Sequence, residues 1–235
     1  MTIPNHIAII PDGNRRWARG RGMEGSLGHE EGAKRFEEIA EFLFHKNVSY
    51  VTFWAASEDN ITKRSKHEVR FLVSLLQKWL AKSLQEKTFV KNKTRFRMIG
   101  RWDILLAKEK STSALKETIK QLEEETKGFS KKNLTILFGY DGRREMTEGI
   151  EDIKKRPSEK ITYEMVHKTL WTGDLPLVDF VIRTGGEPHW SAGFMMWHTA
   201  NAQFYFTKTL WPNFKKIELE KALKDFSERE RRFGK

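Results

Sequence analysis

The chain has 235 residues, no cysteine and a formal net charge of +11, from 43 Lys and Arg against 32 Asp and Glu. The lack of cysteine excludes disulfides, thiolate metal sites and cysteine nucleophiles. The positive charge favours an anionic partner, whether a nucleic acid, a lipid surface or a phosphorylated small molecule. Hydrophobic residues make up 38% of the chain, which is too much apolar material for a disordered protein.

We expect one compact domain over residues 1–235, with two small domains as the alternative, because a domain contains roughly 100–200 residues. No apolar run approaches the ~18–20 residues that a membrane span needs. The N-terminal residues lack a basic region followed by an apolar one, so they do not read as a signal peptide. These features predict a cytoplasmic protein.

Six short runs rich in β-branched and aromatic residues predict strands, at residues 6–11, 49–55, 95–100, 134–138, 178–182 and 203–206. Longer amphipathic patterns between and after them predict helices, at residues 28–46, 66–86, 111–127, 142–155, 162–170 and 217–232. Strand and helix alternate along the chain, and several strands are nearly continuously apolar. This order favours an α/β fold with a mostly parallel central sheet surrounded by helices.

Four predicted strands end in polar or glycine-bearing turns, at residues 11–16, 57–60, 139–144 and 183–187. Ligands of open α/β sheets bind beyond the carboxyl ends of the strands, so these turns indicate one site at one edge. Asp-Gly and Gly-Gly are also ordinary turn formers, which is the simpler explanation for any single turn. Two of the turns, however, place arginine beside glycine, a pairing suited to gripping phosphate.

The first turn is the most informative. Asp12 directly follows an apolar strand, and Gly13 and Asn14 open a predicted helix whose free N–H groups favour an anion. A carboxylate beside an anion is favourable when Mg²⁺ lies between them, because Mg²⁺ is held by one or two carboxylates and substrate phosphates. The P-loop and Gly-x-Gly-x-x-Gly patterns are not found after any strand, which disfavours nucleoside triphosphates and dinucleotides.

This turn lies within the motif His6-Ile7-Ala8-Ile9-Ile10-Pro11-Asp12-Gly13-Asn14-Arg15-Arg16-Trp17-Ala18. The motif closely resembles the opening of the cis-prenyltransferases, the family that includes undecaprenyl diphosphate synthase. Further blocks resemble that family's in the same order, at residues 28–34, 53–60, 179–187, 210–214 and 229–234. The resemblance implies a parallel sheet wrapped by helices, an apolar tunnel for the growing chain, a homodimer, and Mg²⁺-dependent condensation of isopentenyl diphosphate with an allylic prenyl diphosphate.

The resemblance also assigns roles to matching residues. Asp12 matches the essential aspartate that works with Mg²⁺, and Asn60 matches the position associated with proton removal. An amide is a poor base, so we expect Asn60 to position groups and a diphosphate oxygen to accept the proton. Arg183 and Ser191 match the family positions that bind isopentenyl diphosphate. The remaining substrate-binding candidates are Gly13, Asn14, Arg15, Arg16, Trp17, His29, Ser57, Glu58, Asp59, Lys63, His189 and Trp190.

The chain departs from the family pattern at several polar positions. The family usually has arginine at the positions of Gly25, Lys63 and His189, tryptophan at Ile61, and a metal-associated glutamate at Gln203. One extra residue between positions 187 and 194 leaves the register of His189 and Ser191 open. Either nearby Arg19, Arg21 or Arg143 compensates, or a subgroup has its own site, or the acceptor has changed.

Apolar positions outside the turns have simpler explanations. The helical stripe of Phe36, Ile39, Ala40, Leu43 and Phe44 is typical of core packing, as are Trp79, Trp171 and Trp211. Trp17 and Trp190 lie in the turns and are candidates to line the prenyl path. The lysine-rich stretch 82–97 is a solvated face or a peripheral contact with an anionic membrane that receives a lipid product.

The leading hypothesis is a cytoplasmic, Mg²⁺-dependent cis-prenyltransferase that gives a polyprenyl diphosphate. One alternative is prenyl transfer to an acceptor other than isopentenyl diphosphate. Another is a weakly active partner subunit of a hetero-oligomer, which the intact Asp12 and Arg183 disfavour. A nucleic-acid partner is not expected, because the chain has no recognisable RNA-binding motif and its basic residues gather at strand ends.

Overall fold

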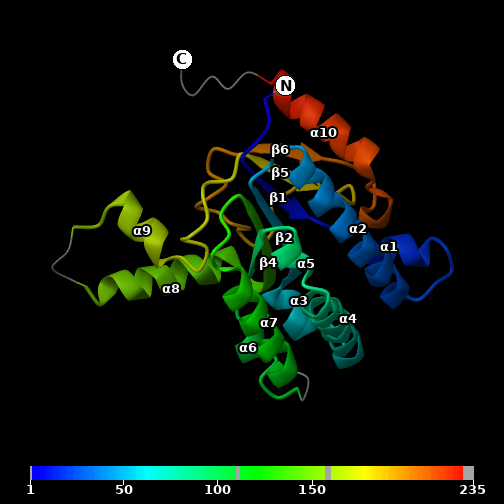
Figure 1. Cartoon of the computed structure of the whole chain (residues 1–235), viewed down its shortest axis with the longest axis horizontal. Helices are drawn as coiled ribbons and strands as arrows, with labels where there is room; N and C mark the ends of the chain where they lie inside the picture. The colour runs from blue at the N-terminus through cyan, green and yellow to red at the C-terminus, as the bar shows by residue number, and fades with distance from the viewer. Residues whose placement is uncertain (1, 110–111, 157–159, 230–235) are drawn as a thin grey trace.

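The computed structural model describes residues 2–109, 112–156 and 160–229. Its centre is a six-stranded sheet in which every neighbouring pair of strands is parallel, in the order β3-β4-β2-β1-β5-β6 (Figure 1). The strands are β1 (His6–Ile10), β2 (Tyr50–Ser57), β3 (Thr94–Ile99), β4 (Lys132–Tyr140), β5 (Phe180–Arg183) and β6 (Gln203–Phe206). The predicted α/β architecture with a parallel central sheet is confirmed, and all six predicted strands are present.

Both faces of the sheet are covered, which explains the continuously apolar strands. Side chains alternate along β1, so that Ile7 and Ile9 join one buried cluster while Ala8 and Ile10 join another on the opposite face. The larger cluster lies under four helices, and the smaller one lies under the irregular chain that follows residue 170 and contains Phe194 and Met195. A strand of alternating polarity would not fit between these two layers.

The four helices on the larger cluster are α2 (Gly25–His45), α4 (Lys66–Gln85), α7 (Thr112–Thr126) and α10 (Lys216–Glu228). α8 (Gly142–Lys154) and α9 (Tyr163–Thr169) extend away from the sheet, on the opposite side of Figure 1 from α1 (Asn14–Arg19) and α2. Local capping sets two of these starts. Ser65 accepts a hydrogen bond from Glu68 N (3.2 Å) before α4, and Asp141 accepts from Arg143 N (2.9 Å) before α8.

The sequence patterns missed several short elements. α5 (Thr88–Lys91), α6 (Trp102–Leu105) and the 3₁₀ turn η1 (Trp211–Asn213) contain too few residues to show a period. The predicted turn at residues 57–60 is instead the start of α3 (Glu58–Lys63), because Ser57 and Asn60 cap each other's backbone N–H groups. β4 also continues through Gly139 and Tyr140, which were assigned to a turn. Of the C-terminal block at residues 229–234, only Arg229 lies within the described residues.

Within the described residues, no helix combines the length and the apolar character needed to cross a membrane.

Two buried histidines, His6 and His198, and the mostly buried His29 give the fold a defined response to acid. Burial is the main cause that lowers the pKa of His6, His29 and His198 from 6.5 to about 4. His6 contacts Pro176 O (2.9 Å) and Thr52 Oγ1 (2.8 Å), so both nitrogens of the neutral ring have hydrogen-bond partners inside the core. The charged ring would lose its hydration there without gaining a carboxylate at hydrogen-bonding distance.

The free energy of unfolding should therefore decrease as the pH is lowered. In the unfolded chain these histidines take up protons below about pH 6.5, whereas in the folded protein they do so only near pH 4, so the stabilisation is full above pH 6.5 and is lost as pH falls. At pH 5 the loss amounts to at most about 2 kcal/mol per histidine. Urea unfolding between pH 7.5 and 5 measures it. The variant His6→Gln should lower the slope by about a third, and a free energy independent of pH in this range would contradict the assignment.

Candidate active site

The carboxyl ends of β1, β2 and β5 meet at one edge of the sheet and form an anion cavity of about 730 Å³. Because the strands are parallel and adjacent, the residues that follow each of them gather there, as the sequence predicted. The predicted residues that line this cavity are Asp12, Gly13, Asn14, Arg15, Arg16, His29, Ser57, Asp59, Asn60, Arg183, His189, Trp190 and Ser191. Other lining residues include Arg19, Trp54, Arg64 and Arg143.

Asp12 lies between two arginines at the centre of the anion cavity. Its Oδ1 is 3.2 Å from Arg16 Nη2, and its Oδ2 accepts a hydrogen bond from Arg183 Nη2 (3.1 Å). Thr184 also donates to the Asp12 carbonyl (2.8 Å), so β5 fixes the turn that follows β1. Gly185 has φ +91°, and a Cβ there would lie 2.7 Å from Arg16 Nη2, which explains glycine at this position.

Arg183 also organises the segment of residues 189–195, which we call the acceptor loop. The arginine is almost fully buried, and its Nη1 donates to Ser191 Oγ (2.5 Å) and to the His189 carbonyl (2.9 Å). Ser191 Oγ lies 2.9 Å from His189 Nε2. The structure therefore brings Arg183, His189 and Ser191 together, and the match of His189 and Ser191 to the family positions stays a prediction.

A second charged group borders the cavity around Glu68. Its carboxylate lies 3.2 Å from Arg64, 3.5 Å from Arg15 and 3.7 Å from His29. Burial, reinforced by the charges of Arg64 and Arg15, lowers the pKa of His29 to about 4. His29 is therefore a neutral ring near pH 7, able to accept or donate one hydrogen bond.

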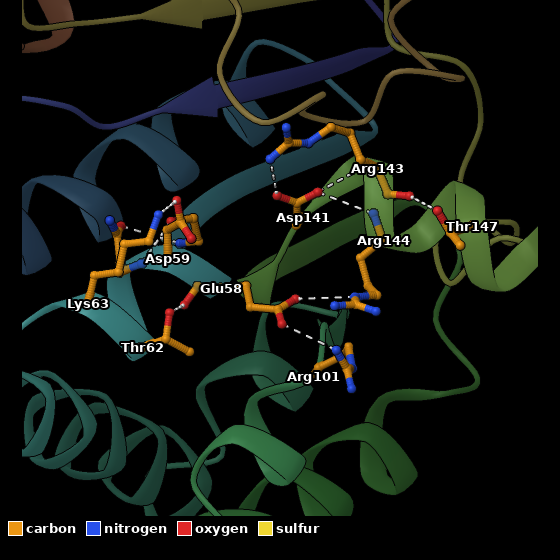
Figure 2. Close-up of polar contacts among 11 residues, drawn as sticks. Glu58, Asp59, Thr62, Lys63, Arg101, Asp141, Arg143, Arg144 and Thr147 are labelled. Carbon is orange, nitrogen blue, oxygen red and sulfur yellow. Dashed lines mark hydrogen bonds and ion pairs between the residues drawn. The ribbon is translucent and has the colours of Figure 1, made fainter.

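Two predicted substrate contacts on α3 point away from the anion cavity. Lys63 is exposed and pairs with Asp59 (2.8 Å), while the neighbouring Arg64 lines the cavity in its place. Glu58 pairs with Arg101 (3.2 Å) and Arg144 (3.9 Å), as Figure 2 shows. These partners come from the ends of β3 and β4, so Glu58 holds α3 against the protein. The only signal in the sequence for the role of Arg64 is its position, one residue after Lys63.

Three more sequence predictions are corrected. Trp17 donates from its indole to Asn213 Oδ1 (2.8 Å) and lines neither cavity described here. Arg21 stacks over the Trp17 ring at 4.1 Å and does not reach the cavity, whereas Arg19 and Arg143 do. Gln203 pairs with Phe180 at the amino end of β5, so within one chain it lies at the opposite end of the sheet from Asp12. Gln203 therefore does not line the anion cavity of its own chain.

A smaller apolar cavity of about 120 Å³ adjoins the anion cavity, between α2, α4 and the sheet. Both cavities share four lining residues, Pro11, Asn14, His29 and Ala55. The apolar part is lined by Ala33 and Phe36 of α2, Leu72, Leu75, Leu76 and Trp79 of α4, Ile136 and Phe138 of β4, and Trp211. The two helices thus form opposite walls of this apolar cavity, which we call the tunnel and which adjoins the anion cavity.

Aromatic side chains form the inner part of this tunnel. Phe36 meets Trp79 edge to face, with ring centroids 5.4 Å apart, and Trp79 also contacts Phe89 and Phe96. The Trp79 indole donates a hydrogen bond to Glu37, which fixes the ring. The assignment of Phe36, Trp79 and Trp211 to ordinary core packing is incomplete, since they also line the tunnel, whereas Trp190 borders the anion cavity.

The charge of the anion cavity suits a polyanion. Among its lining residues are six arginines and two aspartates, a formal excess of 6 − 2 = +4. Two diphosphates fit this excess better than a single carboxylate ligand would. Among the described residues, no group of three or more His, Asp or Glu side chains could hold a metal ion. The lone Asp12 carboxylate still fits Mg²⁺, because phosphate oxygens supply the other ligands of such sites.

An arginine-rich cavity beside an apolar one suits an amphipathic phosphorylated ligand. Residues 10–234 match the model of the family described as "Putative undecaprenyl diphosphate synthase". An isoprenyl transferase from Fusobacterium nucleatum is 41% identical over 99% of this chain and 96% of its own length. The chain therefore belongs to the undecaprenyl diphosphate synthase family, and it is a prenyltransferase, which confirms the resemblance found in the sequence.

Two solved structures support the same assignment. Lavandulyl diphosphate synthase from Lavandula x intermedia, in complex with dimethylallyl diphosphate, is 28% identical with a TM-score of 0.88, over 99% of this chain and 98% of the other. A probable undecaprenyl diphosphate synthase from Campylobacter jejuni is 30% identical with a TM-score of 0.77, over the full length of both chains.

The anchoring of α3 by Glu58 can be tested by Glu58→Gln. This variant removes the charge that joins α3 to Arg101 and Arg144, so we expect amide hydrogen exchange across Glu58–Lys63 to accelerate severalfold. Lys63→Gln is the matched control, because it removes an exposed ion pair of the same helix and should have little effect. Equal exchange rates in the two variants would show that Glu58 does not anchor α3.

Proposed function

We propose that this chain is a Mg²⁺-dependent cis-prenyltransferase that condenses isopentenyl diphosphate with an allylic prenyl diphosphate, giving a polyprenyl diphosphate. The observation that carries this proposal is the junction of the two cavities. A cavity with a formal excess of +4 opens directly into an apolar tunnel, as a ligand with a diphosphate head and a hydrocarbon tail requires. Each buried five-carbon unit contributes about 4 kcal/mol of binding free energy, at about 0.8 kcal/mol per carbon.

The allylic diphosphate binds with its tail in the tunnel and its head beside the turn that follows β1. Arg15 and Arg16 lie on this turn, and Arg64 approaches it from the end of α3. Asp12 would hold Mg²⁺ together with diphosphate oxygens, and the ion supplies charge neutralisation of the leaving diphosphate. The arginines stabilise the same negative charge as the allylic C–O bond breaks.

Isopentenyl diphosphate binds at Arg183 and Ser191, which already contact each other on the far side of Asp12. The new C–C bond joins its terminal alkene carbon to the allylic carbon, and one proton then leaves the former isopentenyl unit. Asn60 hydrogen bonds Ser57 in both directions, so its amide positions the start of α3. An amide does not take up a proton near pH 7, and a diphosphate oxygen accepts it.

The role of Asp12 is tested with labelled isopentenyl diphosphate. Asp12→Ala, or excess EDTA with the unchanged protein, should lower incorporation at least roughly 10²-fold, because the leaving diphosphate loses its neutralising partner. Asp103→Asn, which changes a half-buried carboxylate of α6 that pairs with Lys116 and lines neither the anion cavity nor the tunnel, should keep full activity. Incorporation that survives both Asp12→Ala and EDTA would refute the Mg²⁺-dependent mechanism.

The tunnel floor predicts control of product length. Trp79→Leu removes the ring that closes the inner end beside Phe36, so the products should lengthen by at least one five-carbon unit. Separation of the products by chain length, followed by mass spectrometry, measures the change. Trp102→Leu is the matched control, because Trp102 is also a buried tryptophan of the larger cluster but lines neither cavity. An unchanged product distribution in Trp79→Leu would show that Trp79 does not close the inner end of the tunnel.

An acceptor other than isopentenyl diphosphate is the second candidate function. The observation that favours it is His189, more than half exposed, whose ring is held between Ser191 and Glu187 where the family usually has arginine. Incubation with dimethylallyl diphosphate alone distinguishes the two. Product formed without isopentenyl diphosphate would support this alternative, and strict dependence on isopentenyl diphosphate would exclude it.

We further propose a cytoplasmic homodimer that touches a membrane peripherally. The outer edge of β6 carries Phe206, which is 40% exposed and stacks on Phe204, an apolar edge suited to a second copy. Lys82, Lys87, Lys91 and Lys93 are exposed near the far end of α4 and would favour an anionic lipid surface.

A further inference from the structure

A buried polar network lies beneath the acceptor loop, on the smaller apolar cluster. Tyr140 ends β4 and is fully buried, and its hydroxyl donates to Glu145 Oε2 (2.5 Å). Glu145 stands in the first turn of α8 with 1% of its surface exposed. Its other oxygen accepts from Thr172 N (2.9 Å) and Thr172 Oγ1 (2.7 Å). Neither side chain lines the anion cavity, so neither contacts substrate.

The network reaches the acceptor loop through one hydrogen bond. Met195 N donates to the Tyr140 hydroxyl oxygen (3.2 Å), while that hydroxyl's proton is committed to Glu145. A carboxylate that accepts three hydrogen bonds thus fixes the orientation of the phenol oxygen. Without Glu145, the Tyr140 hydroxyl would lose its acceptor and could turn away from Met195.

The acceptor loop needs such support, because its backbone is unfavourable. Ala192 has φ +44° and Met195 has φ +46°, which side-chain-bearing residues rarely adopt. Gly142 N donates to the Ala192 carbonyl (3.0 Å), and a Cβ at Gly142 would lie 1.8 Å from Gly193 O. The loop therefore rests directly on the start of α8, three residues before Glu145.

The same loop presents Ser191 to the cavity. Phe194 N donates to the Ser191 carbonyl (2.9 Å), and the Trp190 indole donates to the Phe194 carbonyl (2.7 Å), so movement near Met195 is passed to Ser191. Ser191 in turn contacts Arg183, which contacts Asp12. The network is thus connected to the acceptor side of the cavity and lies away from the tunnel.

We propose that the buried Tyr140–Glu145 pair positions the acceptor loop and thereby sets the affinity of the site for isopentenyl diphosphate. The choice of isopentenyl diphosphate as the ligand rests on the proposed function. Tyr140 and Glu145 are positioning residues, since they act through Met195 and Ser191. They leave the tail-binding tunnel unaffected, because α2 and α4 lie on the other face of the sheet.

Tyr140→Phe tests the proposal, since it keeps the ring between Trp171 and Phe194 and removes only the hydroxyl. In the ligand-free protein, amide exchange of Met195 and its neighbours should accelerate about tenfold. With Mg²⁺ present, the KM for isopentenyl diphosphate should rise about fivefold to tenfold, while the KM for the allylic diphosphate changes less than twofold. Glu145→Gln should change the same quantities in the same direction.

Thr126→Val is the matched control. Thr126 is also fully buried, and its hydroxyl also holds one backbone amide, Phe96 N (3.1 Å), but at the opposite face and away from the site. It should lower the free energy of unfolding without raising the KM for isopentenyl diphosphate. If Thr126→Val raised the KM for isopentenyl diphosphate as much as Tyr140→Phe does, the Tyr140–Glu145 pair would only stabilise the fold and would not position the loop.

The two readouts separate the possible failures. Unchanged exchange at Met195 in Tyr140→Phe would refute the positioning of the loop, whatever the substrate. Faster exchange with an unchanged KM for isopentenyl diphosphate would refute the link to the acceptor. Unmodified protein that does not incorporate isopentenyl diphosphate would refute the proposed function and the acceptor named here, while the exchange rates would still decide whether the pair positions the loop.

Discussion

The ion pair between Asp12 and Arg183 is the contact on which the site depends. The two residues are 171 positions apart in the chain, yet they follow neighbouring parallel strands, so the register of β1 against β5 places them within 3.1 Å. Arg183 is buried and Asp12 is partly open to the cavity, so the pair is desolvated on one side and accessible on the other. A buried arginine deprived of this carboxylate would be strongly destabilising. The pair therefore stabilises the sheet edge and presents a carboxylate to an incoming ligand.

The two faces of the sheet support different parts of the site. On one face, α2 and α4 stand far enough apart to leave a tunnel, and its inner end is closed by aromatic rings that would otherwise complete a continuous core. On the other face, irregular chain replaces helices over much of the surface, and a buried polar network holds it in place. An apolar ligand needs only shape from its wall, whereas a diphosphate needs donors at fixed positions, so the polar network lies under the second face.

Much of this arrangement is visible in the sequence. Uninterrupted apolar runs predict the strands, and polar turns after them predict the edge that binds anions, because both depend on local composition. The positions of Asp12 and Arg183 follow from that edge, whereas Ser191 was assigned only by the family resemblance. Glu58 could not be placed, because its partners Arg101 and Arg144 lie some 40 to 90 positions further along the chain. Trp79 has the same helical spacing whether it fills a core or lines a tunnel, so periodicity alone cannot distinguish the two.

Charge and burial together divide the polar edge of the anion cavity from the apolar tunnel beside it. Arg15 and Arg64 lie with His29 around Glu68, at the junction with the tunnel, whereas Arg16 and Arg183 both contact Asp12. His29 at the junction stays neutral near pH 7, because burial and the adjacent arginines oppose its protonation. A positive His29 would extend the cationic surface into the mouth of the tunnel and draw the diphosphate inward. A neutral ring instead ends the charged surface where the apolar cavity begins.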